Sequence, residues 1–191
     1  GASAYCARRP YTRADDLAGK REISDRMASA IYKQGEAARA GGDLEAAVAL
    51  FRRVGEAVPD SDIRMTAEYD AAAALINMQA WDRASSVLEE YRRDYPDSEF
   101  ADDVTQKLAV SYLESGRATA AAAEFERIAE AASSADDVRR EAWWQAADLY
   151  RQSGELLEEE RVLEIVVSRY PSPLAESIEA RYRLLQIAGQ N

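Results

Sequence analysis

Residues 107–128 read KLAVSYLESGRATAAAAEFERI and predict two short helices joined by a tight turn. Gly116 interrupts a stretch that is otherwise rich in residues of high helix propensity. On each side of it, small and apolar residues recur at the spacing of one helical face, namely Leu108, Ala109, Tyr112, Ala121, Phe125 and Ile128. The stretch therefore predicts a helical hairpin whose two helices cross closely.

The same frame recurs on both sides of this hairpin. The small residue of each first helix stands at Gly35, Ala72, Ala109 and Ala147, at steps of 37, 37 and 38 residues. Each second helix carries a stripe at i, i+4 and i+7, formed by Ala47/Phe51/Val54, Ala84/Leu88/Tyr91, Ala121/Phe125/Ile128 and Glu159/Leu163/Val166. Three of these second helices are followed by a proline, at Pro59, Pro96 and Pro171. Self-similarity at this period predicts an all-α array of stacked hairpins.

The frame divides the chain into three parts. Residues 1–23 are an N-terminal extension, partly helical up to Gly19, and Ser24 is the expected N-cap of the first long helix. Residues 24–173 form four hairpins, at about 24–60, 61–97, 98–135 and 136–173. Residues 174–191 form a fifth first helix, which superimposes on residues 141–153 with a step of 38. It is either a capping helix or part of a longer array, and its apolar residues favour the longer array.

The small and large positions, the turn glycine, the Ala-xxx-Phe pair and the terminal proline together resemble the tetratricopeptide repeat. The resemblance implies a right-handed α-solenoid whose concave groove binds proteins or peptides. This chain departs from the family pattern at Glu68, where a large apolar residue is usual, and at Glu159, where alanine is usual. Its period exceeds the family's usual length of about 34 residues, which implies lengthened first helices.

The linkers VPDSDI, RDYPDSEFADD and SRYPSPLAES resemble those of bacterial cell-envelope repeat proteins, including the barrel-assembly lipoprotein and the Tol-Pal coordinator protein. This similarity implies a periplasmic or envelope-associated protein, with the cytoplasm as the alternative. No signal-like or membrane-spanning apolar run is present in the sequence, and we expect that a targeting segment has been removed. Cys6 is the single cysteine, and it reads as a thiol in a mobile tail.

The formal charge of −11 disfavours nucleic acid and anionic lipid as partners, because both require a positive surface. The chain has no histidine, no glycine-rich phosphate loop and no metal-ligand spacing. Acidic clusters such as Asp102-Asp103 stand at helix starts, where a carboxylate favours the helix dipole. We therefore expect a non-catalytic protein that holds no cofactor and no metal.

The fifth position of each first helix forms a ladder in which four of five residues are aromatic: Tyr32, Tyr69, Gln106, Trp144 and Tyr182. In the resembled family this position faces the concave groove, and tyrosine and tryptophan are favoured binding anchors. Neighbouring groove positions implied by the resemblance include Lys33, Asn77, Lys107, Asp148 and Arg151. The alternative is that the rings pack between adjacent first helices as core. The third repeat has Gln106 instead of a ring, and we expect it to contribute least to binding.

These patterns predict a scaffold that binds a protein or peptide segment of basic or neutral character, as one module of a cell-envelope assembly. A structural role, in which unfinished ends of the array stack on neighbouring copies, is a rival interpretation. A regulatory domain of a larger protein is another.

Overall fold

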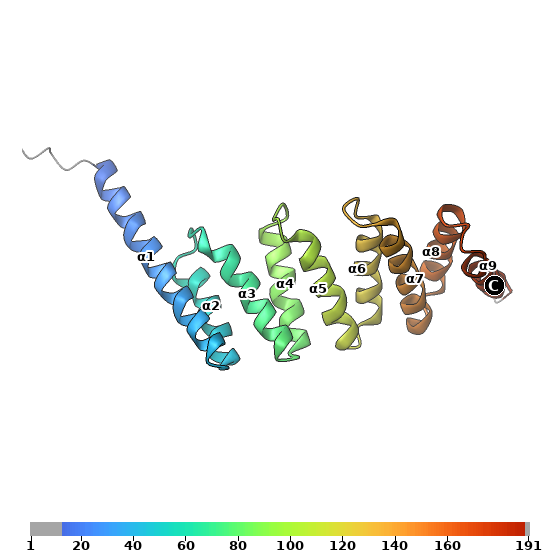
Figure 1. The fold of residues 1–191 in the computed structure, drawn as a ribbon, viewed down its shortest axis with the longest axis horizontal. Coiled ribbons are helices and arrows are strands. Elements are labelled where there is room, and N and C mark those ends of the chain that lie inside the picture. Colours follow the sequence, from blue (N-terminus) through green and yellow to red (C-terminus); the bar gives the residue numbers. More distant parts are fainter. Residues whose placement is uncertain (1–12, 190–191) are drawn as a thin grey trace, which may run out of the picture. The chain divides into compact units, whose positions relative to one another are not determined.

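In the computed structural model, the backbone of residues 13–189 and the side chains of residues 17–189 are described. This part of the chain is all-α (Figure 1). The helices are α1 (Arg13–Ala40), α2 (Leu44–Ala57), α3 (Ile63–Asn77), α4 (Trp81–Asp94), α5 (Ala101–Glu114), α6 (Ala118–Glu130), α7 (Asp136–Ser153), α8 (Leu156–Arg169) and α9 (Leu174–Ala188). The predicted array of helical hairpins is thereby confirmed.

The chain divides into two compact units, Gly1–Ala74 and Leu75–Asn191, with the boundary inside α3. In the first unit α1 packs on α2. In the second unit each helix from α4 to α9 packs on the next one along the chain. In these pairs, helices that follow one another in the sequence pack on one another, as a repeat array requires.

The turn inside each hairpin has one residue in the left-handed conformation. These residues are Gly42, Gln79, Gly116 and Gly154, with φ of 83°, 57°, 75° and 77°. Glycine adopts this conformation without a steric penalty, whereas glutamine is strained in it. Each second helix begins two residues later, at Leu44, Trp81, Ala118 and Leu156.

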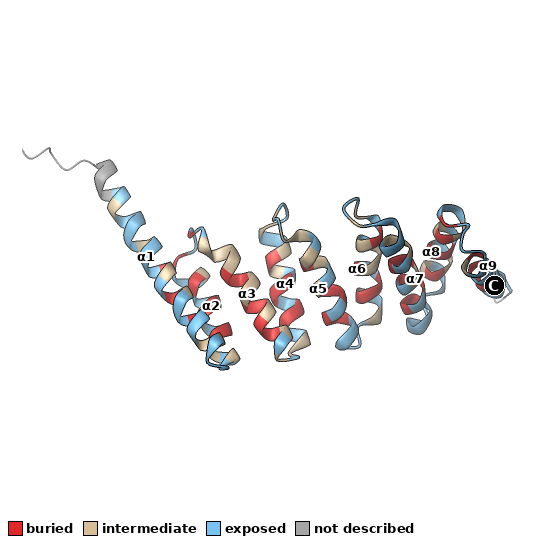
Figure 2. Cartoon of the chain, viewed as in Figure 1, coloured by how far each residue is buried: buried red, intermediate tan, exposed pale blue. Residues whose placement is uncertain are grey.

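The core follows the predicted stripes (Figure 2). In α2, α4 and α8 the stripe residues are fully buried or nearly so, with at most 2% of each residue exposed. Of the three stripe residues of α6, Ala121 is fully buried, while Phe125 and Ile128 are half-buried. The third hairpin thus has a core that is open on one side.

The expected N-cap at Ser24 is wrong, because α1 already includes Arg13 and runs through both Gly19 and Ser24. A single helical glycine costs only about 1 kcal/mol relative to alanine, and its neighbours in α1 are good helix formers. An ion pair also spans Ser24, since Arg26 Nη2 lies 2.6 Å from Glu22 Oε1. The first helix is therefore 28 residues long.

The expected lengthening of first helices applies to α1 and α7 only. Helix α7 has 18 residues, whereas α3 and α5 have 15 and 14, close to the 14 of α2 and α4. The additional residues around α3 and α5 lie in the loops before these helices, where Ser61 N donates to Val58 O and Ser98 N to Tyr95 O.

None of the helices in the described part of the chain is long and apolar enough to cross a membrane.

Helix α9 lies one residue out of its expected register. A step of 37 residues matches buried Ala180, Arg183 and Ile187 with buried Trp143, Ala146 and Tyr150 of α7. The expected step of 38 would instead match Leu185, which is 73% exposed, with fully buried Ala147. Arg181, not Tyr182, is therefore the α9 residue equivalent to Trp144.

Candidate functional site

A groove of about 780 Å³ opens between α5, α6 and α7, inside the second unit. Its apolar lining comes from all three helices: Ala109, Val110, Phe125, Ile128, Val138 and Ala142. Polar and charged residues complete the lining, namely Gln106, Asp137, Arg140, Glu141 and Gln145. The groove combines an apolar floor with a small number of polar groups, which is typical of binding sites.

Phe125 and Ile128 form the floor of this groove and are only half-buried. Their equivalents in the other hairpins are Phe51 and Val54, Leu88 and Tyr91, and Leu163 and Val166, none of which exceeds 1% exposure. The exposure of Phe125 and Ile128 is thus specific to the third hairpin. It is unfavourable in water and needs a local cause.

One cause is the pairing of Ala109 with Phe125. In the first hairpin the equivalent pair is Gly35 and Phe51, and a Cβ atom added at Gly35 would lie 2.7 Å from the Phe51 ring. A phenylalanine ring can therefore occupy the buried position of Phe51 only when the facing residue is glycine. Because Ala109 already carries that Cβ atom, we infer that the larger Phe125 ring is turned towards the groove. The hairpin with Ala147 avoids this conflict by having the smaller Leu163.

The second cause is Gln106, which stands where a ring would cover the floor. In the first unit the equivalent Tyr32 ring lies 5.4 Å from the Phe51 ring, and its hydroxyl donates a 2.6 Å hydrogen bond to Asp70 Oδ2 of α3. Burial, followed by this hydrogen bond, raises the pKa of Tyr32 above its usual value. Tyr32 thus bridges α1 and α3 over a buried floor. Gln106 is exposed and leaves the floor open.

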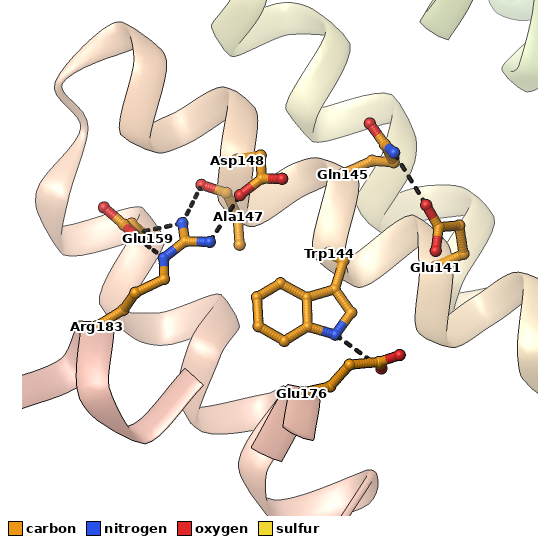
Figure 3. A network of polar contacts seen from close by, with 8 residues as sticks. All are labelled: Glu141, Trp144, Gln145, Ala147, Asp148, Glu159, Glu176 and Arg183. Atoms are coloured by element: carbon orange, nitrogen blue, oxygen red, sulfur yellow. Dashed lines mark hydrogen bonds and ion pairs between the residues drawn. The ribbon is translucent and has the colours of Figure 1, made fainter. Parts of the chain in front are cut away.

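Trp144 also bridges two first helices, α7 and α9 (Figure 3). Its Nε1 donates to Glu176 Oε2 at 3.2 Å, and the Arg183 guanidinium lies 5.7 Å from the ring centroid. The floor on this side, Leu163 and Val166, is fully buried. For Tyr32 and Trp144 the structure therefore favours packing between first helices over a free binding anchor.

The rim of the groove is acidic. Asp137 and Glu141 are exposed on α7; Asp137 Oδ1 accepts from Val138 N at 2.9 Å, and Glu141 Oε1 accepts from Gln145 Nε2 at 3.0 Å. Neither carboxylate forms an ion pair within residues 17–189, although Asp137 lies in the first turn of α7, where the helix dipole partly offsets its charge. The one basic lining residue, Arg140, lies 3.3 Å from Glu176 Oε2 of α9, which offsets its charge. A segment with apolar and basic side chains is complementary to this surface.

The other predicted positions have different surroundings. Asp148 accepts from buried Arg183 at 2.6 Å, and Lys107 lies 3.2 Å from Asp103. Tyr69 is half-buried. Four of the predicted residues are exposed, namely Lys33, Asn77, Arg151 and Tyr182. Gln106 is the one ladder residue that lines the groove, together with Val110, Glu141 and Gln145, which the family resemblance also implies as groove positions. Sequence reasoning assigned Phe125 and Ile128 to the core and expected this repeat to contribute least.

A second hollow, of about 650 Å³, runs along one side of α1 and is lined by residues of α1 alone, from Ala18 to Lys33. No second described helix closes it. It therefore lacks the convergent walls of the groove between α5, α6 and α7.

Known proteins resemble this chain both in sequence profile and in structure. Residues 29–61 and 66–98 match the family profile of the tetratricopeptide repeat. Two solved structures of putative kinesin light chain nearly identical TPR-like repeats from Podosopora anserina, one of them carrying a single substitution, are each 18% identical to this chain. Each match covers 88% of this chain and 89% of the other, with TM-scores of 0.47 for the substituted protein and 0.46 for the other. No curated protein matches.

Proposed function

We propose, on the premise that residues 29–61 and 66–98 are tetratricopeptide repeats, that this chain binds a segment of another protein in the groove between α5, α6 and α7. Repeats of this kind generally serve protein-protein interaction. The observation that carries the proposal is the half-buried floor of Phe125 and Ile128 beneath Gln106. Covering this floor removes apolar surface from water, which is the main driving force of association.

The bound segment has apolar side chains on one face and a basic side chain beside them. The apolar side chains contact Phe125, Ile128, Val110 and Val138, while the basic group approaches Asp137 and Glu141. Helix packing holds the groove in shape before binding, so little conformational entropy is lost on association. Binding is the whole of the activity, and we assign no catalytic residue, cofactor or metal. Among the described residues no cluster of three or more Cys, Asp or Glu side chains is arranged to hold a metal ion.

The experiment that tests this proposal is a titration of labelled peptides with the whole chain, followed by fluorescence anisotropy. Three helical peptides are compared: one with leucines at i, i+4 and i+7 and an arginine beside them, one with glutamate for the arginine, and one with glutamines for the leucines. The leucine–arginine peptide should bind with a Kd in the micromolar range, and the other two at least tenfold more weakly. Equal affinity for all three, or no binding, would contradict the proposal.

The cell envelope is a separate proposal for where the protein acts. It rests on the linkers around Pro59, Pro96 and Pro171, which resemble those of bacterial envelope repeat proteins. Fractionation of cells that produce the full-length protein tests it. Recovery with the periplasm or membranes is expected, and recovery with the cytoplasm would contradict it.

A further inference from the structure

Helix α9 presents an apolar stripe to solvent. Leu174, Ile178, Tyr182 and Leu185 follow one another at steps of four, four and three residues, so they share one face of the helix. Between 56% and 73% of each residue is exposed. The opposite face carries Ala180, Arg183 and Ile187, which are buried towards the preceding helices. The α9 stripe, as we call these four residues, is therefore not part of the core.

The repeat itself does not require this stripe. With the step of 37 residues, the same positions on α7 are Asp137, Glu141, Gln145 and Asp148, all of which are exposed and polar. Each apolar residue of α9 thus replaces a polar one. A contiguous apolar patch on otherwise charged helices marks an interaction surface.

A cation lies beside the stripe. Arg181 is exposed on α9, one residue before Tyr182, and forms no ion pair within residues 17–189. The α9 stripe together with Arg181 is a helical face with apolar side chains and one free positive charge. The groove requires a segment of this character, because its floor is apolar and its rim carries Asp137 and Glu141.

We propose that the α9 stripe of one copy of this chain occupies the groove between α5, α6 and α7 of a second copy. The inference rests on the proposed function, since it names the partner of the same groove. Ile178 and Tyr182 cover Phe125 and Ile128 of the second copy, and Arg181 approaches its Glu141. The contact brings together a convex apolar ridge and an apolar hollow, and it joins opposite charges at the rim.

The size of the two surfaces predicts a weak, reversible contact. The stripe presents on the order of 500 Å² of apolar surface, which gives about 1,000 Å² in total when the groove is included, in the range of transient complexes. Association should therefore be visible at tens of micromolar and above. Because two different surfaces meet, the contact is heterologous and further copies can add to it.

The test is the average mass of the full chain over about 1–300 µM, measured by sedimentation equilibrium. The wild-type mass should rise above the monomer value of 21.1 kDa with concentration. Gln106→Trp fills the groove and Ile178→Glu charges the stripe, and both sites lie on exposed parts of helices. Each variant should associate at least tenfold more weakly than the wild type, with unchanged helicity. Leu157→Glu, at a residue 76% exposed on α8, is the matched control and should behave as wild type.

Mixing the two variants separates this pairing from others. Gln106→Trp retains an intact stripe and Ile178→Glu an intact groove, so the mixture should form a one-to-one complex that neither variant forms alone. If Ile178→Glu abolishes association while Gln106→Trp leaves it intact, the stripe pairs with another surface and the inference is overturned. A wild-type chain that stays at 21.1 kDa throughout also overturns it.

A charge exchange tests the predicted role of Arg181. Arg181→Glu should weaken association several-fold, and adding Glu141→Arg in the same chain should restore it. Loss without restoration would contradict the placement of Arg181 at this rim.

Peptide binding is measured separately at low chain concentration. If the leucine–arginine peptide binds and the chain does not self-associate, the inference fails while the proposed function stands; if neither occurs, both fail.

Discussion

Arg183 of α9 and Glu159 of α8 form an ion pair in which both residues are at most 3% exposed. Arg183 Nε lies 2.8 Å from Glu159 Oε1, and the guanidinium also donates to Asp148 Oδ1 and to the carbonyl oxygen of Ala147 (Figure 3). Glu159 stands at the position of Ala47, Ala84 and Ala121 in the other second helices. A pair of opposite charges here replaces close packing of small residues.

Removing one member of this pair should destabilise the second unit strongly. Glu159→Ala leaves a buried guanidinium with part of its charge uncompensated, and we expect a loss of about 2–4 kcal/mol in the free energy of unfolding. Glu159→Ala combined with Arg183→Leu should recover most of that loss, since it removes both charges. Urea denaturation followed by circular dichroism measures both variants. A single variant as stable as the wild type would show that the pair is dispensable.

Tyr112 and Tyr150 of the second unit, like Tyr32 of the first, make stability depend on pH above 10. Tyr112 donates to Glu89 Oε1 at 2.5 Å, and Tyr150 donates to Glu126 Oε1 at 2.6 Å. Burial, and then these hydrogen bonds, raise the pKa of both hydroxyls above the usual value near 10. The folded chain retains protons that the unfolded chain releases, so this stabilisation is complete below pH 10 and is lost as the pH rises towards the folded-state pKa values.

Replacing both tyrosines by phenylalanine should flatten this pH dependence. Tyr112→Phe with Tyr150→Phe loses about 1 kcal/mol per hydrogen bond at pH 7, but its stability should fall less steeply than that of the wild type between pH 10 and 11.5. Thermal unfolding at a series of pH values gives the comparison. If stability falls equally steeply with pH in the wild type and in the double variant, neither tyrosine has a raised pKa.

The turn at Gln79 should tolerate glycine better than glutamine. Gln79 has a φ of 57°, in the region that Gly42, Gly116 and Gly154 occupy in the other turns. Gln79→Gly relieves the strain of a left-handed non-glycine residue and should stabilise the chain by about 0.5–1 kcal/mol. The reverse change Gly116→Gln is the matched control and should destabilise by a similar amount. A lower melting temperature for Gln79→Gly would contradict this reading of the turn.

The close approach of Gly35 and Phe51 gives a further prediction, in the first unit. Gly35→Ala adds a Cβ atom 2.7 Å from the fully buried Phe51 ring and should destabilise by about 1–3 kcal/mol, although alanine is the better helix former. Gly35→Ala with Phe51→Leu recreates the pair Ala147–Leu163 of the fourth hairpin and should regain most of the loss. Denaturant unfolding of the single and double variants tests both statements. No rescue by Phe51→Leu would exclude the ring as the source of strain.

Sequence periodicity was sufficient to predict the hairpins, their turns and the buried stripes. The signals are strong because the small residues Gly35, Ala72, Ala109 and Ala147 recur at steps of 37, 37 and 38 residues and because Pro59, Pro96 and Pro171 follow the second helices. The start of α1 was mispredicted because Gly19 and Ser24 resemble helix boundaries, whereas the surrounding propensity carries the helix through them. The register of α9 was mispredicted because a step of 37 or 38 residues is equally regular in sequence, and only burial distinguishes the two.

The groove was not predicted, although two residues that create it are visible in the sequence. Gln106 interrupts the ladder of rings, and Ala109 faces Phe125 where Gly35 faces Phe51. Taken alone, Gln106 indicates a weak third repeat and Ala109 is an ordinary small residue of the repeat. Together they expose Phe125 and Ile128, and this consequence depends on how a ring at one position covers a floor contributed by another helix. Such a relationship between helices has no signature in a single periodic pattern.

The affinity of the Gln106→Trp variant for the leucine–arginine peptide tests the central claim most directly. The new ring should cover Phe125 and Ile128 as Tyr32 covers Phe51, with a melting temperature equal to or above that of the wild type. Gln34→Trp, at an exposed position of α1 outside the groove, is the control. We predict that Gln106→Trp raises the Kd at least tenfold while Gln34→Trp leaves it unchanged. An unchanged Kd for folded Gln106→Trp would show that the peptide is held elsewhere and would contradict the account.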